Sequence, residues 1–450
     1  MNTQGAPTPH SQFSTLDSPL IRPGYKQTEV GEIPSDWDLV PFSEFVDFQN
    51  GINAGKEAYG QGFRFANVLE IITNSHLNAE SVPGRIQISD SAAKRYALEP
   101  GDYLFNRTSE IPEEVGLASV YMGTERVVFG GFVIRGRPRD LRLRRIYAGY
   151  GLRSPLVRKQ IVSKGQGAIR SNIGQTDLRD VLVLIPKDSE QEAIAGALGD
   201  ADALIESLKA LIAKKRQIKQ GAMQELLTGN TRLPGFTGEW ETSQLGEIAS
   251  IQRGASPRPI DSPIWFNTES QVGWVRISDV TSAGMYLSQT TQHLSPLGIK
   301  HSRPVGRGSL IMSICATVGR PIITAIDTCI HDGFVVFDSL RVNREFLYYV
   351  LGSIENDWSR HGQTGSQMNL NTGLISRTEV PVAPTPDEQE AIAAVLSDMD
   401  AEIATLEAKL AKARQIKQGM MQELLTGKTR LVESGKLIVE SEGNTKETAR

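Results

Sequence analysis

The chain has 450 residues, of which 39% are hydrophobic and 22% are charged, and its formal net charge is −4. This composition is typical of a globular protein with room for two or three domains, and it excludes a protein coated in basic residues. The amino-terminal region is polar, and no apolar run approaches the roughly 18 residues of a membrane span. Cys315 and Cys329 form neither a disulfide framework nor a metal-binding spacing, which fits a reducing compartment, so we expect a cytoplasmic protein.

Residues 1–24 are rich in Pro, Ser, Thr and Gln, and this composition predicts a disordered leader. The first folded block is predicted at residues 25–187. It consists of short β-branched and aromatic runs between turn residues, with a helical stretch before a loop that begins GQG at Gly165. This pattern predicts a mixed α+β domain.

The first block contains a dense basic segment. From Arg126 to Arg170 there are twelve Lys or Arg residues and one acid, Asp140. Such a segment in an acidic chain predicts a polyanion partner, because arginine suits phosphates and guanine edges. The alternative is that individual arginines pair with acids such as Glu110, Glu113, Glu114 and Glu125. The candidate DNA-binding residues of this block are Arg107, Arg135, Arg137, Arg139, Arg142, Arg144, Arg145, Arg170 and Asn172.

A long helix is predicted at residues 188–229, and the chain contains it twice. Residues 190–233 and 388–431 are identical at 31 of 44 positions without a gap. Ser189 with Glu192, and Asp387 with Glu390, have the spacing of capping boxes. Gly229 and Gly427 can adopt the left-handed conformation that ends a helix. Each copy then spans roughly 58 Å at 1.5 Å per residue, and a helix of that length cannot bury a face alone.

Apolar residues in both copies are spaced 4-3-4-3-4, which is the pattern of a coiled-coil seam. Acids lie early and bases late in each copy, so antiparallel pairing sets opposite charges against each other. The alternative is two separate helices, each docked on its own domain. The predicted seam consists of Ile194, Leu198, Ile205, Leu208 and Ile212 in the first helix and Ile392, Leu396, Met399, Ile403, Leu406 and Leu410 in the second.

The second block, at residues 230–386, corresponds faintly to the first, which predicts two pseudo-symmetric domains. The offset drifts, as expected for one fold with different loops. The matched segments begin at Trp37 and Trp240, Arg64 and Arg276, Gly101 and Gly308, Gly131 and Gly333, Tyr150 and Tyr349, and Gly165 and Gly362.

The second block is less basic, and its loops are richer in amides. Asn and Gln can bond adenine bidentately, but loops contain many of them for other reasons. The candidate DNA-binding residues of this block are Arg253, Arg276, Arg303, Arg307, Arg320, Gln363, Gln367 and Asn369. The second long helix is predicted at residues 387–428, and residues 429–450 are expected to form a flexible tail.

Catalytic machinery is not evident in the sequence. There is no P-loop, no GxGxxG after a strand, no HExxH, no metal-spaced Cys/His cluster, no glycine-rich S-adenosylmethionine loop and no Asn-Pro-Pro-Tyr-like tetrapeptide. We therefore expect a chain that is not an enzyme and that holds neither a cofactor nor a metal.

The opening GYKQTEVGEIPSDWDLV, the doubled EQEAIA helices and the repeated RQIKQGxMQELLTG resemble the DNA-specificity subunits of type I restriction–modification systems. The resemblance covers residues 25–431. It implies two target recognition domains that each read one half of a split double-stranded DNA site, separated by an antiparallel coiled coil. It also implies docking of two methyltransferase subunits, which bind S-adenosylmethionine, and of restriction subunits through the complex.

Two other classes remain open on the residues. One is a coiled-coil protein-interaction scaffold without sequence-specific DNA binding, and the other is an enzyme, such as a single-chain methyltransferase, whose site has no recognisable motif. If the specificity subunit is correct, the length of the helices should set the gap between the half-sites, because one turn of B-DNA is roughly 34 Å.

Overall fold

The structure is a computed structural model that describes residues 21–165, 167, 170–358, 370–431 and 437–438. The predicted leader up to residue 20, most of the predicted tail, and the candidates Gln363, Gln367 and Asn369 lie outside the described residues. The chain divides into two compact units. Unit 1 contains residues 1–207 and 411–450, and unit 2 contains residues 208–410. No helix in the described residues is both long and apolar enough to cross a membrane.

Unit 1 is built on a five-stranded sheet, whose outermost pair, β10 and β6, is parallel while the other neighbours are antiparallel. Unit 1 also contains a three-stranded sheet, three two-stranded pairings and the short antiparallel pair β26 (Arg430–Leu431) and β27 (Leu437–Ile438). The five-stranded sheet has the order β4 (Val46–Asn50), β12 (Val133–Pro138), β8 (Tyr103–Asn106), β10 (Ala118–Tyr121) and β6 (His76–Leu77). The others are β11 (Val127–Phe129), β5 (Tyr59–Ala66) and β7 (Arg85–Ile86); β1 (Tyr25–Thr28) with β2 (Gly31–Pro34); β14 (Leu182–Ile185) with β3 (Asp38–Pro41); and β13 (Ser171–Asn172) with β9 (Thr108–Ser109).

Unit 2 repeats this topology with the same parallel pair at one edge of its five-stranded sheet. That sheet has the order β16 (Ser250–Arg253), β24 (Phe334–Asp338), β21 (Leu310–Ser313), β22 (Pro321–Thr324) and β18 (Tyr286–Leu287). The remaining strands are β19 (Gln292–His293), β17 (Gly273–Val275), β23 (Thr328–Ile330) and β20 (Arg303–Val305), and the pair β15 (Glu241–Gln244) and β25 (Glu379–Val382).

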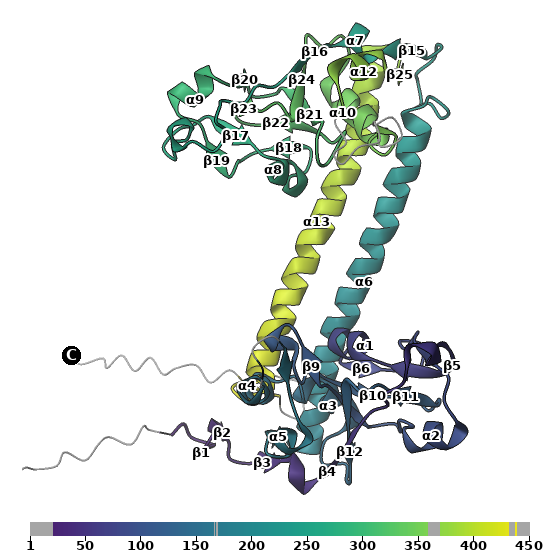
Figure 1. The fold of residues 1–450 in the computed structure, drawn as a ribbon, viewed down its shortest axis with the longest axis vertical. Coiled ribbons are helices and arrows are strands. Elements are labelled where there is room, and N and C mark those ends of the chain that lie inside the picture. Colours follow the sequence, from purple (N-terminus) through teal and green to yellow (C-terminus); the bar gives the residue numbers. More distant parts are fainter. Residues whose placement is uncertain (1–20, 166, 168–169, 359–369, 432–436, 439–450) are drawn as a thin grey trace, which may run out of the picture. The chain divides into compact units, whose positions relative to one another are not determined.

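Short helices surround these sheets. Those of unit 1 are α1 (Val68–Thr73), α2 (Asp90–Arg95), α3 (Arg145–Gly151), α4 (Pro155–Lys164) and α5 (Gln175–Arg179). Those of unit 2 are α7 (Leu245–Ile248), α8 (Ile277–Ser282), α9 (Pro296–Lys300), α10 (Arg344–Ser353) and α12 (Thr372–Arg377). In unit 2, α10 and α12 adjoin the long helix α13, and α9 with β19 and β20 lies away from it (Figure 1). The predicted fold class, with two similar mixed α/β domains and two long helices, is confirmed.

Two of the predicted correspondences between the domains are out of register. The backbone N–H of Gly51 donates to the carbonyl of Val133, and that of Gly254 donates to the carbonyl of Phe334. Val133 is therefore equivalent to Phe334, and the predicted match of Gly131 with Gly333 is wrong by one residue. In unit 1 Ala66 pairs with Phe129, and in unit 2 Val275 pairs with Ile330. Ala66 is therefore equivalent to Val275, and the predicted match of Arg64 with Arg276 is wrong by three residues. Loops of different length separate the strands, and sequence similarity alone does not fix a strand's register.

The long helices α6 (Asp188–Leu226) and α13 (Pro386–Leu424) are each 39 residues long. The predicted capping boxes are wrong, because Ser189 and Asp387 lie inside the first turn rather than before it. In α13, the hydroxyl of Thr385 instead accepts a hydrogen bond from the Glu388 N–H. The predicted left-handed conformation of Gly229 and Gly427 is confirmed, with φ values of +72° and +70°, although the helices end three residues earlier, at Leu226 and Leu424.

Ion pairs show the antiparallel direction within each unit. In unit 1, Lys417 Nζ of α13 lies 2.5 Å from Asp202 Oδ1 of α6. In unit 2, Lys219 Nζ lies 2.5 Å from Asp400 Oδ1, and Lys215 Nζ lies 2.7 Å from Glu402 Oε1. Early acids of each helix therefore meet late bases of the other, as the charge pattern predicted.

The seam residues divide between two kinds of packing. Ile194 and Leu198 belong to the core of unit 1, and Ile392 and Leu396 belong to the core of unit 2. The remaining seam residues lie outside both cores or at their margins: Ile205, Ile212, Ile403 and Leu406 are buried, and Leu208, Met399 and Leu410 are half-buried. Both alternatives therefore hold in part, because the start of each helix docks on its own domain and a later stretch pairs with the other helix.

Candidate nucleic-acid interface

Loops at one end of the five-stranded sheet are held together by the same backbone hydrogen bonds in both units. In unit 1, Arg107 donates to the carbonyl of Phe132 at 2.8 Å and accepts from Ile173 at 3.0 Å. In unit 2, Ile314 donates to Gly333 at 2.8 Å and accepts from Leu370 at 3.1 Å. We call this part of each unit its recognition end, comprising residues 51–53, 107–108, 130–132 and 170–173 in unit 1 and residues 254–258, 314–315, 331–333 and 370 in unit 2.

A glycine permits the closest approach in each recognition end. A Cβ on Gly51 would lie 2.1 Å from the Gly130 carbonyl oxygen, and a Cβ on Gly254 would lie 2.1 Å from that of His331. No other residue fits these positions without moving the backbone. The two domains therefore use one backbone scaffold to present different side chains.

The recognition end of unit 1 is polar, with one exposed aromatic ring. Arg107 Nη1 lies 3.5 Å from the carbonyl oxygen of Gly131, and Asn172 Oδ1 accepts from the Thr108 hydroxyl at 2.7 Å. Arg170 pairs with Glu110 at 2.7 Å, so one of the acids proposed as an alternative partner does bind a candidate arginine. The ring of Phe132 is 56% exposed.

Two asparagines also lie at this end of the sheets, and the sequence did not single them out. Asn53 Oδ1 occupies the space that a Cβ on Gly131 would take, and Asn67 Oδ1 lies 3.4 Å from the position of a Cβ on Gly130. Asn67 directly follows β5, and Asn53 lies three residues after β4. Because β4 and β5 belong to different sheets, no local pattern in the sequence brings these two residues together.

The recognition end of unit 2 is organised around Asp332. Ser256 Oγ donates to Asp332 Oδ1 at 2.6 Å, and Arg258 Nη2 lies 2.9 Å from Asp332 Oδ2. Arg253 Nε donates to the main-chain carbonyl of Asp332 at 2.7 Å, and Arg303 donates to the carbonyl of Arg253 at 2.6 Å. Burial acts to raise the pKa of Asp332, but the Ser256 hydrogen bond and the Arg258 charge outweigh it, so the pKa lies below its ordinary value.

Arg276 and His331 adjoin this cluster. His331 lies between Trp274 and Phe334, with ring centroids 5.6 Å and 4.8 Å away. Burial lowers the pKa of His331 to about 4, although the charge of Asp332 acts in the opposite direction. Arg276 lies over the Trp274 ring and donates to Gln292 Oε1 at 2.6 Å. At neutral pH the positive charge here comes from the arginines.

The predicted arginine cluster from Arg135 to Arg145 is mostly paired within unit 1. Arg135 is half-buried, donates to the Ala97 carbonyl and lies over the Phe129 ring. Arg137 pairs with the buried Asp102 at 2.8 Å. The other ion pairs are Arg137 with Glu99, Arg139 with Asp47, Arg142 with Asp140 and Glu44, and Arg144 with Asp188 and Glu192.

Arg144 and Arg145 face α6 instead of the recognition end. They line a groove of about 900 Å³ with the exposed Leu141 and Ile146, and the opposite wall is the start of α6. Arg145 has no carboxylate partner within the described part of the chain. Arg307 and Arg320 are also separate from the recognition end of unit 2. The backbone N–H of Arg307 donates to Asp327, and Arg320 lines a cavity of about 640 Å³ beside Tyr286 and Tyr348.

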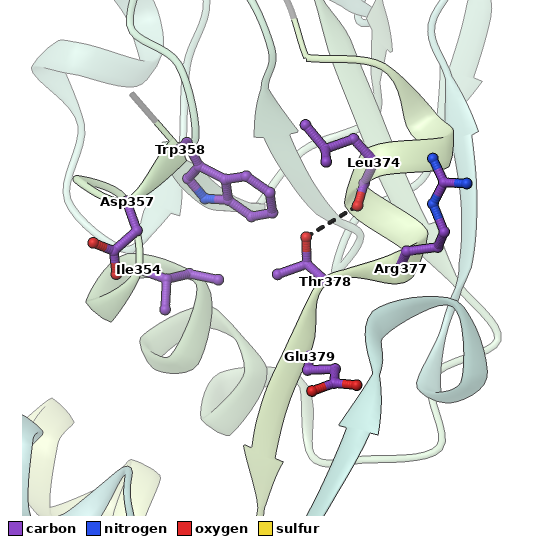
Figure 2. A pocket seen from close by; sticks show the side chains of 7 residues that line it. All are labelled: Ile354, Asp357, Trp358, Leu374, Arg377, Thr378 and Glu379. Carbon is purple, nitrogen blue, oxygen red and sulfur yellow. Dashed lines mark hydrogen bonds between the residues drawn. The ribbon is translucent and has the colours of Figure 1, made fainter. Parts of the chain in front are cut away.

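Figure 2 shows another cavity, of about 500 Å³, in which Trp358, Ile354 and Leu374 form an apolar wall. The hydrogen bond drawn between its residues joins Thr378 Oγ1 to the Leu374 carbonyl at 3.0 Å. Such a wall with one side chain-to-backbone bond does not align a nucleophile with a base. Among the residues that the structure covers, no group of three or more His, Cys, Asp or Glu side chains could hold a metal ion.

The fold and the two recognition ends define a class of protein with two similar reading domains on a pair of antiparallel helices. Residues 237–415 match the type I restriction modification DNA specificity domain. A putative type I restriction enzyme MjaX specificity subunit of Methanocaldococcus jannaschii is 25% identical over 425 residues, covering 90% of this chain and 97% of the relative. The EcoDI specificity subunit of Escherichia coli is 23% identical over 261 residues, covering 52% of this chain and 58% of that protein.

Solved structures share the fold. The S subunit of a type I system from M. genitalium aligns with a TM-score of 0.53 at 16% identity, covering 86% of this chain and 96% of that one. A structure described as the basis of complex assembly and conformational transition of the type I restriction–modification system aligns with a TM-score of 0.56 at 17% identity, covering 88% of this chain and 99% of that one. The chain is therefore similar to the DNA-specificity subunits of type I restriction–modification systems over 90% of its length, and it shares their fold. These similarities support sequence-specific DNA recognition within a complex, by a subunit that is not the catalytic one.

Proposed function

We propose that each recognition domain reads one half of a split double-stranded DNA site through its recognition end. The observation that carries this proposal is the repeated scaffold, in which matched hydrogen bonds at Arg107 and Ile314 hold the loops while the exposed side chains differ. Two readers with one backbone and different side chains suit two different short sequences. The predicted limits, residues 25–187 and 230–386, are the proposed target recognition domains.

The side chains at the recognition ends suit base edges. Arginine bonds guanine bidentately and asparagine bonds adenine, while an exposed aromatic ring can contact a thymine methyl group. In unit 1 these groups are Arg107, Asn53, Asn67, Asn172 and Phe132. Arg137, Arg139, Arg142 and Arg144 are paired with carboxylates of unit 1, so we do not assign them a contact with DNA.

The long helices are the proposed dock for two methyltransferase subunits, and restriction subunits join through the complex. Ile218 and Ile416 occupy equivalent positions of α6 and α13, and they are 47% and 51% exposed. Two equivalent apolar side chains on nearly identical segments suit two copies of one partner. S-adenosylmethionine and ATP then belong to the partners, and the complex would act in the cytoplasm on host DNA.

Selection of bound duplexes from a random pool by the chain assembled with its methyltransferase subunits tests this function. We expect a motif of two short blocks with an unspecified gap, and affinity that falls steeply with salt because phosphate contacts release counterions. A protein-interaction scaffold would select no motif. Methyl transfer to DNA by the purified chain alone would instead support the enzyme alternative.

A further inference from the structure

We propose that Arg107 and Arg258 read one guanine each, Arg107 in the half-site of unit 1 and Arg258 in that of unit 2. The two arginines come from different loops, so sequence correspondence does not relate them. They nevertheless adjoin the same position of the shared scaffold. This inference rests on the proposed function, because it assigns the reading of each half-site to a particular side chain.

The shared position is Gly131 in unit 1 and Asp332 in unit 2. Arg107 donates its backbone N–H to Phe132 where Ile314 donates to Gly333, so the residues before these acceptors, Gly131 and Asp332, are equivalent. Arg107 Nη1 lies 3.5 Å from the Gly131 carbonyl oxygen. Arg258 Nη2 lies 2.9 Å from Asp332 Oδ2. Each recognition end therefore places a guanidinium group at this loop, and in unit 2 Arg253 also contacts the main-chain carbonyl of Asp332.

The arginine has changed loops between the two domains. The residue equivalent to Arg107 is Ile314, which is buried and offers no polar group. Gly51 matches Gly254 by their hydrogen bonds to β12 and β24, and four residues further on Gly55 matches Arg258. Unit 1 thus has an arginine after β8 and a glycine after β4. Unit 2 instead has an isoleucine after β21 and an arginine after β16.

Both guanidinium groups can exchange their present contacts for a base. Arg107 has no carboxylate partner in the part of the chain that the structure describes, and its contact with Gly131 is long for a hydrogen bond. Arg258 is 69% exposed and Asp332 is 40% exposed, and exposed ion pairs of this kind are weak because water screens both charges. The planar fork of arginine matches O6 and N7 of guanine, whereas lysine cannot bond both atoms in this way.

Arg253 has a different role from Arg258 in this cluster. Its Nε donates to the main-chain carbonyl of Asp332, and its own carbonyl accepts from Arg303. Both contacts hold loop backbone. Arg253 is therefore a positioning residue for the loop that carries Arg258.

The experiment compares Arg107→Ala, Arg107→Lys, Arg258→Ala and Arg258→Lys in the chain assembled with its methyltransferase subunits. Each complex is used for selection from a random pool of duplexes. For Arg107→Ala we expect discrimination at one G·C pair of one half-site to fall roughly tenfold to hundredfold, while the other half-site is unchanged. Arg258→Ala should relax one pair of the opposite half-site. The lysine variants keep the charge and should relax the same pairs.

Arg139→Ala is the matched control. Arg139 is an exposed arginine paired with Asp47, and it directly follows β12 at the strand end opposite the recognition end. Its replacement should leave both half-sites intact. An unchanged motif in the Arg107 and Arg258 variants would overturn the proposal, as would relaxation of both half-sites by either variant. Uniformly weaker binding without relaxation would assign these arginines to phosphates and also overturn it. A wild-type complex without a split motif would instead contradict the proposed function.

Discussion

At the residue scale, matching contacts explain why many residues are identical in the two long helices. Glu190 pairs with Arg430 at 2.7 Å, and Glu388 pairs with Arg232 at 2.5 Å. Gln191 and Gln389 each accept a backbone N–H of their own domain, from Arg144 at 2.8 Å and from Asn343 at 2.7 Å. Glu190 and Glu388 thus join the start of one long helix to the segment that follows the other. Gln191 and Gln389 join the start of each long helix to its own domain.

Tyrosines of the domains complete these contacts. Tyr150 donates to Asp202 at 2.9 Å in unit 1, and Tyr349 donates to Asp400 at 2.8 Å in unit 2. The same carboxylates bind Lys417 and Lys219. One aspartate therefore connects a domain, its own long helix and the other long helix, which explains why these positions do not vary between the two copies.

Arg430→Ala should destabilise unit 1, because it leaves the buried carboxylate of Glu190 without its ionic partner. Removing one member of a buried pair typically costs about 3–5 kcal/mol. Urea denaturation of the full chain measures this change, and Arg414→Ala on the exposed face of α13 is the control, expected within about 0.5 kcal/mol of the wild type. Equal stability of the two variants would show that the Glu190 pair is not important to the fold.

His331 predicts a pH dependence of stability. Burial lowers its pKa to about 4 in the folded chain, against an ordinary value of 6.5. The unfolded chain therefore binds more protons between these values, so the free energy of unfolding rises with pH from about 4 to 6.5 and then levels off at the value for neutral His331. The slope in this window should be shallower in His331→Gln, which cannot titrate. The same slope in both proteins would contradict a depressed pKa for this side chain.

At the element scale, the long helices were predictable and the roles of the arginines were not. Heptad spacing and charge asymmetry are local patterns, so they predicted the two helices and their antiparallel pairing. The partners of Arg137, Arg139 and Arg144 are acids 35 to 92 residues away in the chain, and only the folded sheet brings them together. For the same reason the sequence did not identify Asn53 and Asn67, because their place at the recognition end depends on strand order. The repeated topology was predictable, but its register was not, because the connecting loops differ in length.

Leu198 and Leu204 on α6 provide a test of how this helix packs. Leu198 is fully buried in the core of unit 1, whereas Leu204 is 53% exposed. Leu198→Ala should lower the free energy of unfolding by about 2–5 kcal/mol, because it removes buried methyl groups and leaves a cavity. Leu204→Ala makes the same chemical change on the surface and should cost less than about 0.5 kcal/mol. Thermal unfolding of both variants measures the difference, and similar losses would contradict the packing of α6.

At the scale of the whole molecule, the nearly identical helices hold the domains, and the recognition ends carry the side chains that differ between the domains. The contacts of Glu190, Asp202 and their counterparts fix how each domain meets the helices, and they leave the loops at the recognition ends free to vary. Changes of DNA sequence preference then need no change in the parts that hold the domains and partners. We infer that a few loop side chains determine specificity and that the helices determine spacing.

The length of the helices should set the gap between half-sites. Inserting seven residues after Ala210 and seven after Ala408 lengthens each helix by about 10 Å while it leaves the ion pairs of Asp202 and Asp400 in place. Because ten base pairs span about 34 Å, we expect the selected gap to grow by about three base pairs. Insertion of four residues after Lys214 alone shifts the seam and serves as the comparison. A gap that stays the same in a stable double-insertion variant would remove the helices as the determinant of spacing.

The central claim is that one chain reads two half-sites, one with each domain. Mapping of methylated bases across the DNA of a host that expresses the chain with its methyltransferase subunits tests this claim most directly. We expect methylated adenines in a motif of two short specified blocks separated by a gap of constant length. Methylation in one continuous motif, or methylation without sequence preference, would contradict it.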